Sequence, residues 1–184
     1  MATKSLQNSS SCIYLLNLVL LISGKLCASD NLLKDVCRQT QDEAFCMNVL
    51  GSDPRTRDAR LFQLGQITID LGAYSATGTK VKIHSLFLSE KDPELKIRLS
   101  VCDENYDDAI DSLREAVDDL EHGEYTDLKL EGGSVYGDAY DCEDAFKKPP
   151  AYTSPLTDEN YRLQRFGEII IIIANMFRFK DRFF

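Results

Sequence analysis

The sequence has 184 residues, with 21 lysine and arginine residues against 30 aspartate and glutamate residues. This length suits one domain with a substantial core, and the net charge of −9 excludes a general nucleic-acid binder, which needs a basic face. An apolar content of 43% excludes a wholly disordered chain. Two histidines are a thin supply for zinc chemistry or acid–base catalysis, so the composition points away from an enzyme.

The first 29 residues are typical of a secretory signal peptide. Lys4 lies in a short polar start, residues 12–22 form an apolar run, and small residues follow at 27–29. A membrane anchor is the alternative, but eleven helical residues cover about 16 Å, roughly half of a bilayer core. Cleavage after residue 28 or 29 removes Lys4 and Lys25 and no acid, which leaves 19 bases against 30 acids and a net charge of −11.

The same cleavage changes the cysteine count, because Cys12 and Cys27 leave with the signal. Four cysteines remain, namely Cys37, Cys46, Cys102 and Cys142. An even number on a route through an oxidising compartment predicts two disulfides, although spacing alone does not choose among the three pairings. A metal site is the alternative, and the absence of CxxC spacing disfavours it.

A small helical hairpin is predicted over residues 30–52. Its first helix covers Asp30 to Arg38, and the capping-box spacing of Thr40 and Glu43 predicts a second helix that reaches about Leu50. Cys37 and Cys46 fall on these two helices, so a disulfide between them clips the hairpin.

Two long helices are predicted next. The first covers Asp58 to about Leu88, with an apolar seam at Leu64, Ile67, Leu71, Tyr74, Val81 and Leu88. The second has Asp92 as N-cap and Pro93 at its first position, and it closes at His122-Gly123. Its seam is Leu95, Leu99, Cys102, Tyr106, Ala109, Leu113, Ala116 and Leu120.

Two more helices complete the pattern. One covers Glu124 to about Lys147, before Pro149-Pro150, and the last starts at Thr157. Their apolar faces are Leu128, Val135, Ala139, Cys142 and Phe146, and then Leu163, Phe166, Ile170, Ile173 and Phe177. The prediction is an all-α fold, an antiparallel up-and-down four-helix bundle over residues 58–180 behind the hairpin. Cys102 and Cys142 lie on neighbouring seams, which favours pairing between neighbours, and residues 181–184 are left as a tail.

The pattern resembles the plant invertase and pectin methylesterase inhibitor family over residues 30–177. The matching segments are VCRQTQDEAFC, LGSDPRTRDA, DPELKIRLSVCDENYDDAIDSL, DAYDCEDAFKK and SPLTDEN. Within the family the sequence is most similar to the invertase-inhibitor-like pollen allergens of the plane-tree type. The resemblance implies one inhibitor domain over residues 30–180 and disulfides Cys37–Cys46 and Cys102–Cys142. It also implies stoichiometric binding to an enzyme without a cofactor.

The family divides between two targets, the sucrose site of acid invertases and the substrate cleft of pectin methylesterases. In some invertase inhibitors of the family, a Pro-Lys-Phe tripeptide after the glycine that ends the long helix enters the active site. The matching positions here are Tyr125, Thr126 and Asp127, and none of the three residues is retained. Together with Glu124 they form one candidate target-binding segment.

A run of acids on the second long helix is the other candidate. Its members are Asp103, Glu104, Asp107, Asp108, Asp111, Glu115, Asp118, Asp119 and Glu121, with Arg114 as the only base between them. Such a run is either a solvated face or a docking face for a basic partner, which would speed association. Asp107, Asp111 and Asp118 are the candidates for docking. Cation binding by Asp107, Asp108 and Asp111 is disfavoured because they spread around a helix.

These observations predict a secreted, monomeric inhibitor that binds one target enzyme and has no catalytic residues, metal or cofactor of its own. No catalytic or nucleotide-binding motif occurs in the sequence, and His84 and His122 lie on different predicted helices. The favoured target is acid invertase, with pectin methylesterase second and a non-inhibitory structural, storage or ligand-binding bundle third. The expected location is the apoplast and cell wall, with the vacuole as an alternative, and no membrane association after signal cleavage.

Overall fold

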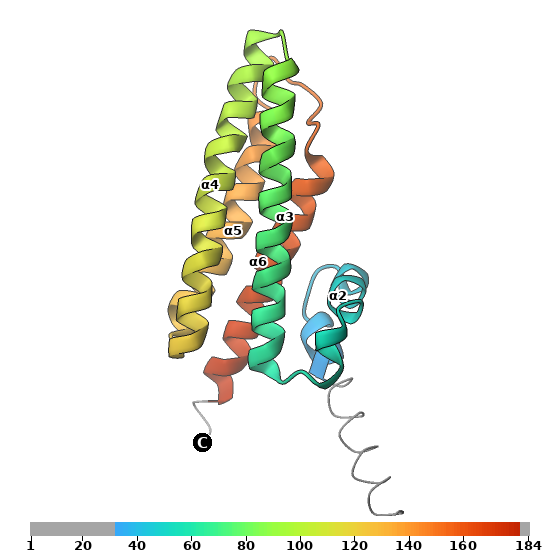
Figure 1. Cartoon of the computed structure of the whole chain (residues 1–184), viewed down its shortest axis with the longest axis vertical. Coiled ribbons are helices and arrows are strands. Elements are labelled where there is room, and N and C mark those ends of the chain that lie inside the picture. Colours follow the sequence, from blue (N-terminus) through green and yellow to red (C-terminus); the bar gives the residue numbers. More distant parts are fainter. Residues whose placement is uncertain (1–31, 181–184) are drawn as a thin grey trace, which may run out of the picture.

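The structure, a computed structural model, describes residues 32–180 and contains an all-helical bundle. Its long helices are α3 (Leu61–Ser89), α4 (Pro93–His122), α5 (Tyr125–Ala145) and α6 (Thr157–Lys180). The predicted four-helix fold is therefore confirmed (Figure 1). The predicted signal peptide, Cys12, Cys27 and the tail 181–184 lie outside the described residues.

Consecutive helices run antiparallel and pack side by side. α4 packs against α3 and α5, α6 packs against α5 and α3, and the four helices close a ring around one core. The turn between α4 and α5 lies at the same end of the bundle as the start of α3 and the end of α6 (Figure 1). No helix within residues 32–180 is long and apolar enough to cross a membrane.

Helix α4 begins and ends where its sequence predicts. The Asp92 side chain accepts a hydrogen bond from the Glu94 N–H at 2.9 Å, and Pro93 occupies the first turn. Gly123 ends the helix with φ of 75°, a left-handed conformation that glycine adopts without strain. Seven of its eight predicted seam residues are buried, and Leu95 is half-buried.

The predicted seam of α3 is partly wrong. Leu64 and Ile67 are buried, but Tyr74, Val81 and Leu88 are 83%, 69% and 68% exposed. The face that enters the core instead combines small residues with isoleucine: Gly65, Ile69, Gly72, Ala76, Thr79 and Ile83. These positions recur at spacings of four and three, so the helical period is right and the face is shifted. Small side chains let the bulkier residues of α4 and α6 fill the core.

The hairpin consists of a helix over residues 32–37 and α2 (Glu43–Gly51), and its helix cap differs from the prediction. Asp42, rather than Thr40, is the N-cap of α2, and its carboxylate accepts from the Phe45 N–H at 2.9 Å. The Thr40 hydroxyl instead donates to the carbonyl of Cys37. A short 3₁₀ helix, η1 (Pro54–Asp58), was not predicted and connects the hairpin to α3.

A second apolar cluster and a polar network hold the hairpin against α6. The buried members of the cluster come from the hairpin, the start of α3 and the second half of α6, and they include Leu33, Val36, Leu50, Ile169, Ile172 and Ile173. At the edge, Arg165 donates to the Gln41 side chain at 3.1 Å, and the Gln41 N–H donates to Glu168 at 2.8 Å. The Tyr161 hydroxyl donates to Asp42.

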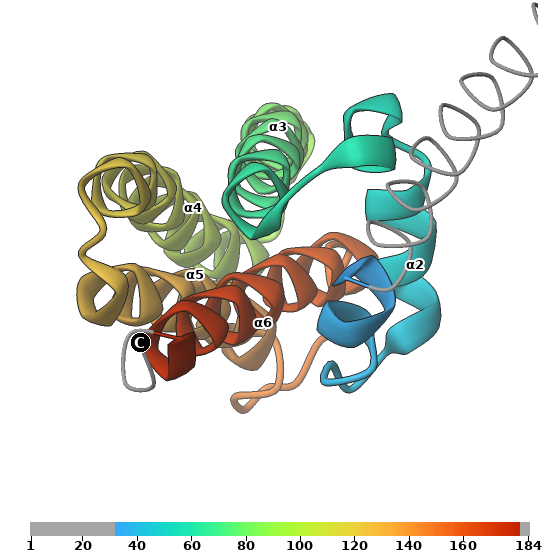
Figure 2. The same ribbon diagram turned by 90° about the horizontal axis from the view of Figure 1, so that it is seen from below.

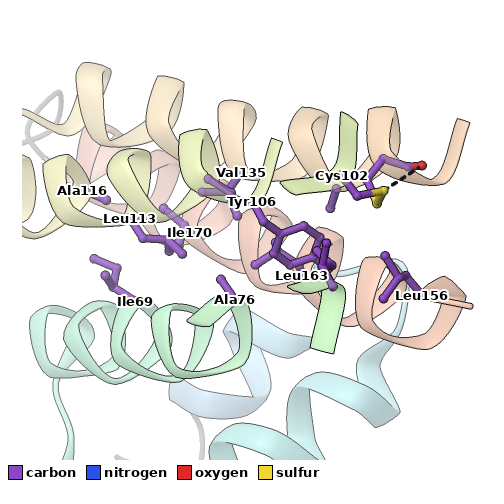
Figure 3. Packing of buried hydrophobic residues seen from close by; sticks show 14 of the residues in the cluster. Ile69, Ala76, Cys102, Tyr106, Leu113, Ala116, Val135, Leu156, Leu163 and Ile170 are labelled. Carbon is purple, nitrogen blue, oxygen red and sulfur yellow. Dashed lines mark hydrogen bonds between the residues drawn. A yellow bond between two sulfur atoms is a disulfide. The ribbon is translucent and has the colours of Figure 1, made fainter. Parts of the chain in front are cut away.

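The bundle core is closed by side-chain packing and by a disulfide between α4 and α5. Figure 3 shows Ile69 and Ala76 of α3 facing Leu113 and Ala116 of α4, with Ile170 of α6 beside them. The disulfides are Cys37–Cys46 and Cys102–Cys142, with Cα–Cα distances of 5.4 and 4.5 Å. This is the pairing that the family resemblance implies.

Helices α5 and α6 approach each other closely at one pair of glycines. A Cβ placed on Gly167 would lie 2.6 Å from the carbonyl oxygen of Gly132 and 2.8 Å from the amide nitrogen of Tyr136. Both neighbours are backbone atoms, so only glycine fits at Gly167 without moving a helix. This contact fixes the position of α5 and of the turn that precedes it.

Candidate target-binding face

The turn between α4 and α5 is short and well ordered by backbone hydrogen bonds. The N–H groups of Gly123 and Glu124 both point at the carbonyl of Asp119, the latter at 2.8 Å. The chain then enters α5 at Tyr125, and the Glu124 carbonyl accepts from the N–H groups of Asp127 and Leu128. Because the left-handed Gly123 reverses the chain within two residues, acids at the end of α4 meet acids at the start of α5.

Tyr125 points inward while its neighbours point outward. Its ring stacks on Phe177 of α6 with the centroids 4.3 Å apart and an interplanar angle of 3°. Tyr125 is half-buried, whereas Glu124, Thr126 and Asp127 are exposed. The four residues of the predicted segment therefore have different roles, since Tyr125 fixes the segment to the bundle and the other three form surface.

The exposed surface at this turn is strongly acidic. We call it the acidic turn, and its members are Asp118, Asp119, Glu121, Glu124 and Asp127. Carboxylate oxygens of Asp119, Glu124 and Asp127 lie within 4.8 Å of one another. Partial burial and then the charges of Glu131, Asp127 and Glu124 raise the pKa of Asp119 to about 6. Within residues 32–180 these three carboxylates are the group that could hold a cation together, although exposed acids often cluster without one.

The structure separates the three docking acids that the sequence predicts. Lys80 of α3 pairs with Asp107 at 2.6 Å, and Arg114 pairs with Asp111 at 2.5 Å. Asp118 lies one turn from the end of α4, where its carbonyl contacts Nδ1 of His122 at 2.7 Å. Asp107 and Asp111 are therefore partly neutralised by bases of the same chain, and only Asp118 belongs to the acidic turn.

His122 is the one base at the acidic turn among the described residues. The hydrogen bond to the Asp118 carbonyl raises the pKa of the imidazole, and the charges of Glu124, Asp118 and Glu121 act in the same direction. The raised pKa favours a protonated ring at the helix end, where the helix dipole also favours a cation. One positive charge leaves the acidic turn with a clear excess of negative charge.

Sequence reasoning missed one acid, Asp138 of α5, that faces α4. Its Oδ2 atom is buried and has no hydrogen-bond partner. The pKa of Asp138 is raised to about 6, mainly by burial and then by the charges of Asp108, Asp141 and Glu131. The available signal was weak, because Glu131 and Asp138 are separated by seven residues on a helix whose other acids are scattered. Asp138 therefore takes up a proton more readily than an ordinary exposed aspartate.

Residues 31–173 match the family described as Plant invertase/pectin methylesterase inhibitor. The chain belongs to this family. It is a family of enzyme inhibitors, so the chain is not an enzyme. A pectinesterase inhibitor of Actinidia deliciosa is 35% identical over 92% of this chain and 94% of its own length. A plane-tree protein of Platanus acerifolia is 31% identical over 91% of this chain and 96% of its own length.

Two further relatives bear on the target and the fold. A cell wall / vacuolar inhibitor of fructosidase from Arabidopsis thaliana is 31% identical over 80% of this chain and 86% of its own length. The crystal structure of a mutant pectin methylesterase inhibitor from Arabidopsis superposes with a TM-score of 0.68 at 26% identity, covering 77% of this chain and 93% of that chain. Relatives of this inhibitor family thus carry the names of both targets.

Residues 125–127, which the sequence matches to the Pro-Lys-Phe positions of some invertase inhibitors, lie at the acidic turn. Tyr125 stands at the proline position and begins a helix, and its ring is held by Phe177. Asp127 replaces the aromatic residue with an exposed carboxylate. The segment is therefore a helical, negatively charged surface and not an extended loop with a free aromatic side chain.

Proposed function

We propose that this protein is a secreted inhibitor of a cell-wall pectin methylesterase, and that the acidic turn contacts a basic surface beside the active site of that enzyme. The observation that carries the proposal is the packing of Tyr125 on Phe177. That packing turns the segment after Gly123 into a rigid acidic surface. A rigid surface binds with a small loss of conformational entropy, and complementary charge speeds encounter.

The geometry supports pectin methylesterase ahead of acid invertase, which is the opposite of the order that the sequence suggests. Residues 125–127 retain none of the three residues of Pro-Lys-Phe and form the first turn of α5, so the insertion into a sucrose site that the resemblance describes has no matching residues here. Covering a cleft requires only an exposed surface, which the acidic turn supplies. The 35% identity to a pectinesterase inhibitor supports the same order.

Acid invertase is the second candidate target. It is supported by the identity of 31% to an Arabidopsis inhibitor of fructosidase. Exposed Thr126 and Asp127 offer a hydroxyl and a carboxylate, groups that can hydrogen-bond with the hydroxyls of a sugar-binding site. Under either target the proposed location is the cell wall, with the vacuole as the alternative, and the signal peptide over residues 1–29 remains a prediction.

A titration against both enzymes tests the proposal. The mature chain is added over a concentration series to pectin methylesterase and to acid invertase near pH 5, and residual activity is measured. We expect stoichiometric inhibition of pectin methylesterase and none of invertase at equal concentration. Inhibition of invertase alone would reverse the order of targets, and inhibition of neither at micromolar protein would refute the proposed function.

A further inference from the structure

A groove lies between the hairpin and the bundle, and none of its lining residues belongs to the acidic turn. Figure 2 shows α2 beside α6 and α3, on the side of the bundle away from α4 and α5. A cavity of about 560 Å³ opens here, lined by residues within 48–52 at the end of α2, by one side of α3 over 71–82, and by residues within 158–166 of α6. We call it the hairpin groove. Its volume is that of a small-molecule binding site.

Gly78 leaves open space at the hairpin groove. It lies in the middle of α3, where glycine is less favourable than every residue except proline. Gly65 and Gly72 of the same helix are explained by packing, because a Cβ there would lie 2.9 and 3.2 Å from leucine side chains of α4. A Cβ on Gly78 would instead meet no atom within 4 Å outside its own helical turn, among the residues that the structure describes. Gly78 therefore has no packing role, and a larger side chain at this position would fill the groove.

The exposed groups of the hairpin groove match the chemistry of a sugar. Tyr74 is 83% exposed, and its ring makes no hydrogen bond or ring contact with the described part of the chain. Asn48 and Ser52 add an exposed amide and an exposed hydroxyl. An aromatic ring packs on the C–H face of a sugar ring, and amides and hydroxyls form hydrogen bonds with its hydroxyls. Helix α3 borders the groove over residues 71–82, about 16 Å at 1.5 Å per residue, which is room for about three sugar rings.

Arg162 supplies a free positive charge at the hairpin groove. Lys82 is occupied, because its ammonium pairs with Glu159 at 2.6 Å and donates to the Pro155 carbonyl at 3.0 Å. Asp158 lies in the first turn of α6, where the helix dipole stabilises a carboxylate. The exposed guanidinium of Arg162 has no ion pair with any described residue. A guanidinium binds a carboxylate through two parallel hydrogen bonds, so a carboxylate-bearing ligand fits this end of the groove.

We infer that the hairpin groove binds a short oligosaccharide that carries one carboxylate, with a sugar ring on Tyr74 and the carboxylate on Arg162. Charge limits the ligand to one carboxylate, because a chain of net charge −11 after the predicted signal cleavage repels polyanions. Two kinds of polysaccharide contain such a segment: a polyuronide whose other carboxyls are methyl esters, and a neutral glycan with a single uronic acid branch. The inference does not depend on the proposed function, since this binding requires no target enzyme.

Calorimetric titration of the mature chain tests the inference with two acidic trisaccharides. One is trigalacturonic acid with two of its three carboxyls methyl-esterified, and the other is xylobiose that carries one glucuronic acid. Their neutral counterparts are the fully esterified trimer and xylotriose. We expect at least one acidic probe to bind with a Kd below about 1 mM, and its neutral counterpart to bind at least about tenfold more weakly. The acidic probe that binds identifies the source of the ligand.

Matched variants locate the binding. Gly78→Leu fills the groove and should weaken the binding of the acidic probe at least about tenfold. Gly133→Leu is the control, at a glycine of α5 where a Cβ also meets no atom within 4 Å, and it should leave the affinity unchanged. Arg162→Gln should weaken the binding of the acidic probe to the level of its neutral counterpart. Circular dichroism checks that each variant is folded.

Four results would overturn the inference. They are no binding of either acidic probe at about 5 mM, equal affinity for acidic and neutral probes, equal affinity of the two leucine variants, and an Arg162→Gln variant that keeps its preference for the acidic probe. The Arg162→Gln result does not require the groove to be filled, so it decides the question even where Gly78→Leu does not fold.

Discussion

Helices α3 and α4 have almost the same length and pack against each other, yet their core faces and their exposed faces differ in composition. Helix α4 buries large residues such as Leu113 and Leu120 and turns acids outward. Helix α3 places glycine and alanine beside buried isoleucines against its neighbours, and it leaves Tyr74, Val81 and Leu88 exposed. Each helix thus has one face in the core and one exposed face, and the chemistry of the exposed faces differs.

This difference gives one bundle two kinds of exposed surface. An acidic surface gains long-range attraction to a basic partner, mainly through faster association. An apolar surface gains affinity from desolvation and works only at contact. Because the two surfaces lie on different helices, a change in one should leave the other intact, and the variants below test that separation.

The largest expected effect comes from removing the covalent link between α4 and α5. Cys102→Ala with Cys142→Ala opens a loop with a sequence separation of 40 and should lower the free energy of unfolding by about 4 kcal/mol. The matching pair Cys37→Ala with Cys46→Ala, with a separation of nine, should cost about 2.7 kcal/mol. Urea denaturation measures both. A larger loss for the hairpin pair would contradict the view that α4 and α5 carry the stability.

The next prediction compares the stability lost on truncating a buried leucine of α4 with that lost on truncating an exposed leucine of α3. Leu113 is 1% exposed, and Leu113→Ala should lower the free energy of unfolding by about 3 kcal/mol because it leaves a cavity. Leu88→Ala removes the same atoms from a side chain that is 68% exposed and should change stability by less than about 0.5 kcal/mol. Thermal unfolding at low protein concentration compares them. Equal losses would place Leu88 in the core.

A smaller effect concerns the pH dependence of the α4–α5 face. Burial raises the pKa of Asp138 to about 6 in the folded chain, above the ordinary value of 3.8. The folded state therefore binds this proton more tightly, so the contribution of Asp138 to stability is fully present below about pH 4 and is lost as pH rises through 6. Asp138→Asn should remove this dependence and gain about 1 kcal/mol at pH 7, less than the full shift because solvent still reaches the carboxyl. Melting temperatures at pH 4.5 and 7 measure it, and parallel curves for the two proteins would contradict the assignment.

The sequence predicts α4 almost completely because every signal in it agrees. Asp92 and Pro93 begin the helix, Gly123 ends it, and acids occupy the positions that the apolar seam leaves free. In α3 apolar residues lie on two faces, and the core face combines isoleucine with glycine and alanine, whose contribution to hydrophobic periodicity is small. Only contact with α4 and α6 decides which face is buried.

The candidate site was predictable as a segment but not as a surface. The loss of Pro-Lys-Phe can be read from residues 125–127, but the stacking of Tyr125 depends on Phe177, which lies 52 positions later. The approach of Asp119 to Asp127 depends on the left-handed conformation of Gly123. The buried Asp138 depends on the register between α4 and α5, which local spacing does not determine.

The central claim is that the acidic turn makes the contact with the target enzyme. It is tested most directly by the rate of association with pectin methylesterase, measured at low and at physiological ionic strength. The test variant combines Glu121→Lys, Glu124→Lys and Asp127→Lys. Its control combines Asp35→Lys, Glu43→Lys and Asp158→Lys, exposed acids on the hairpin and α6, for an equal change in net charge.

We expect the unmodified chain to associate at least about tenfold more slowly when salt is raised, and the test variant to associate slowly at both ionic strengths. The control should keep most of the rate and its dependence on salt. Equal rates for the test variant and the unmodified chain, or equal losses in test and control, would contradict the claim that the acidic turn docks on the target.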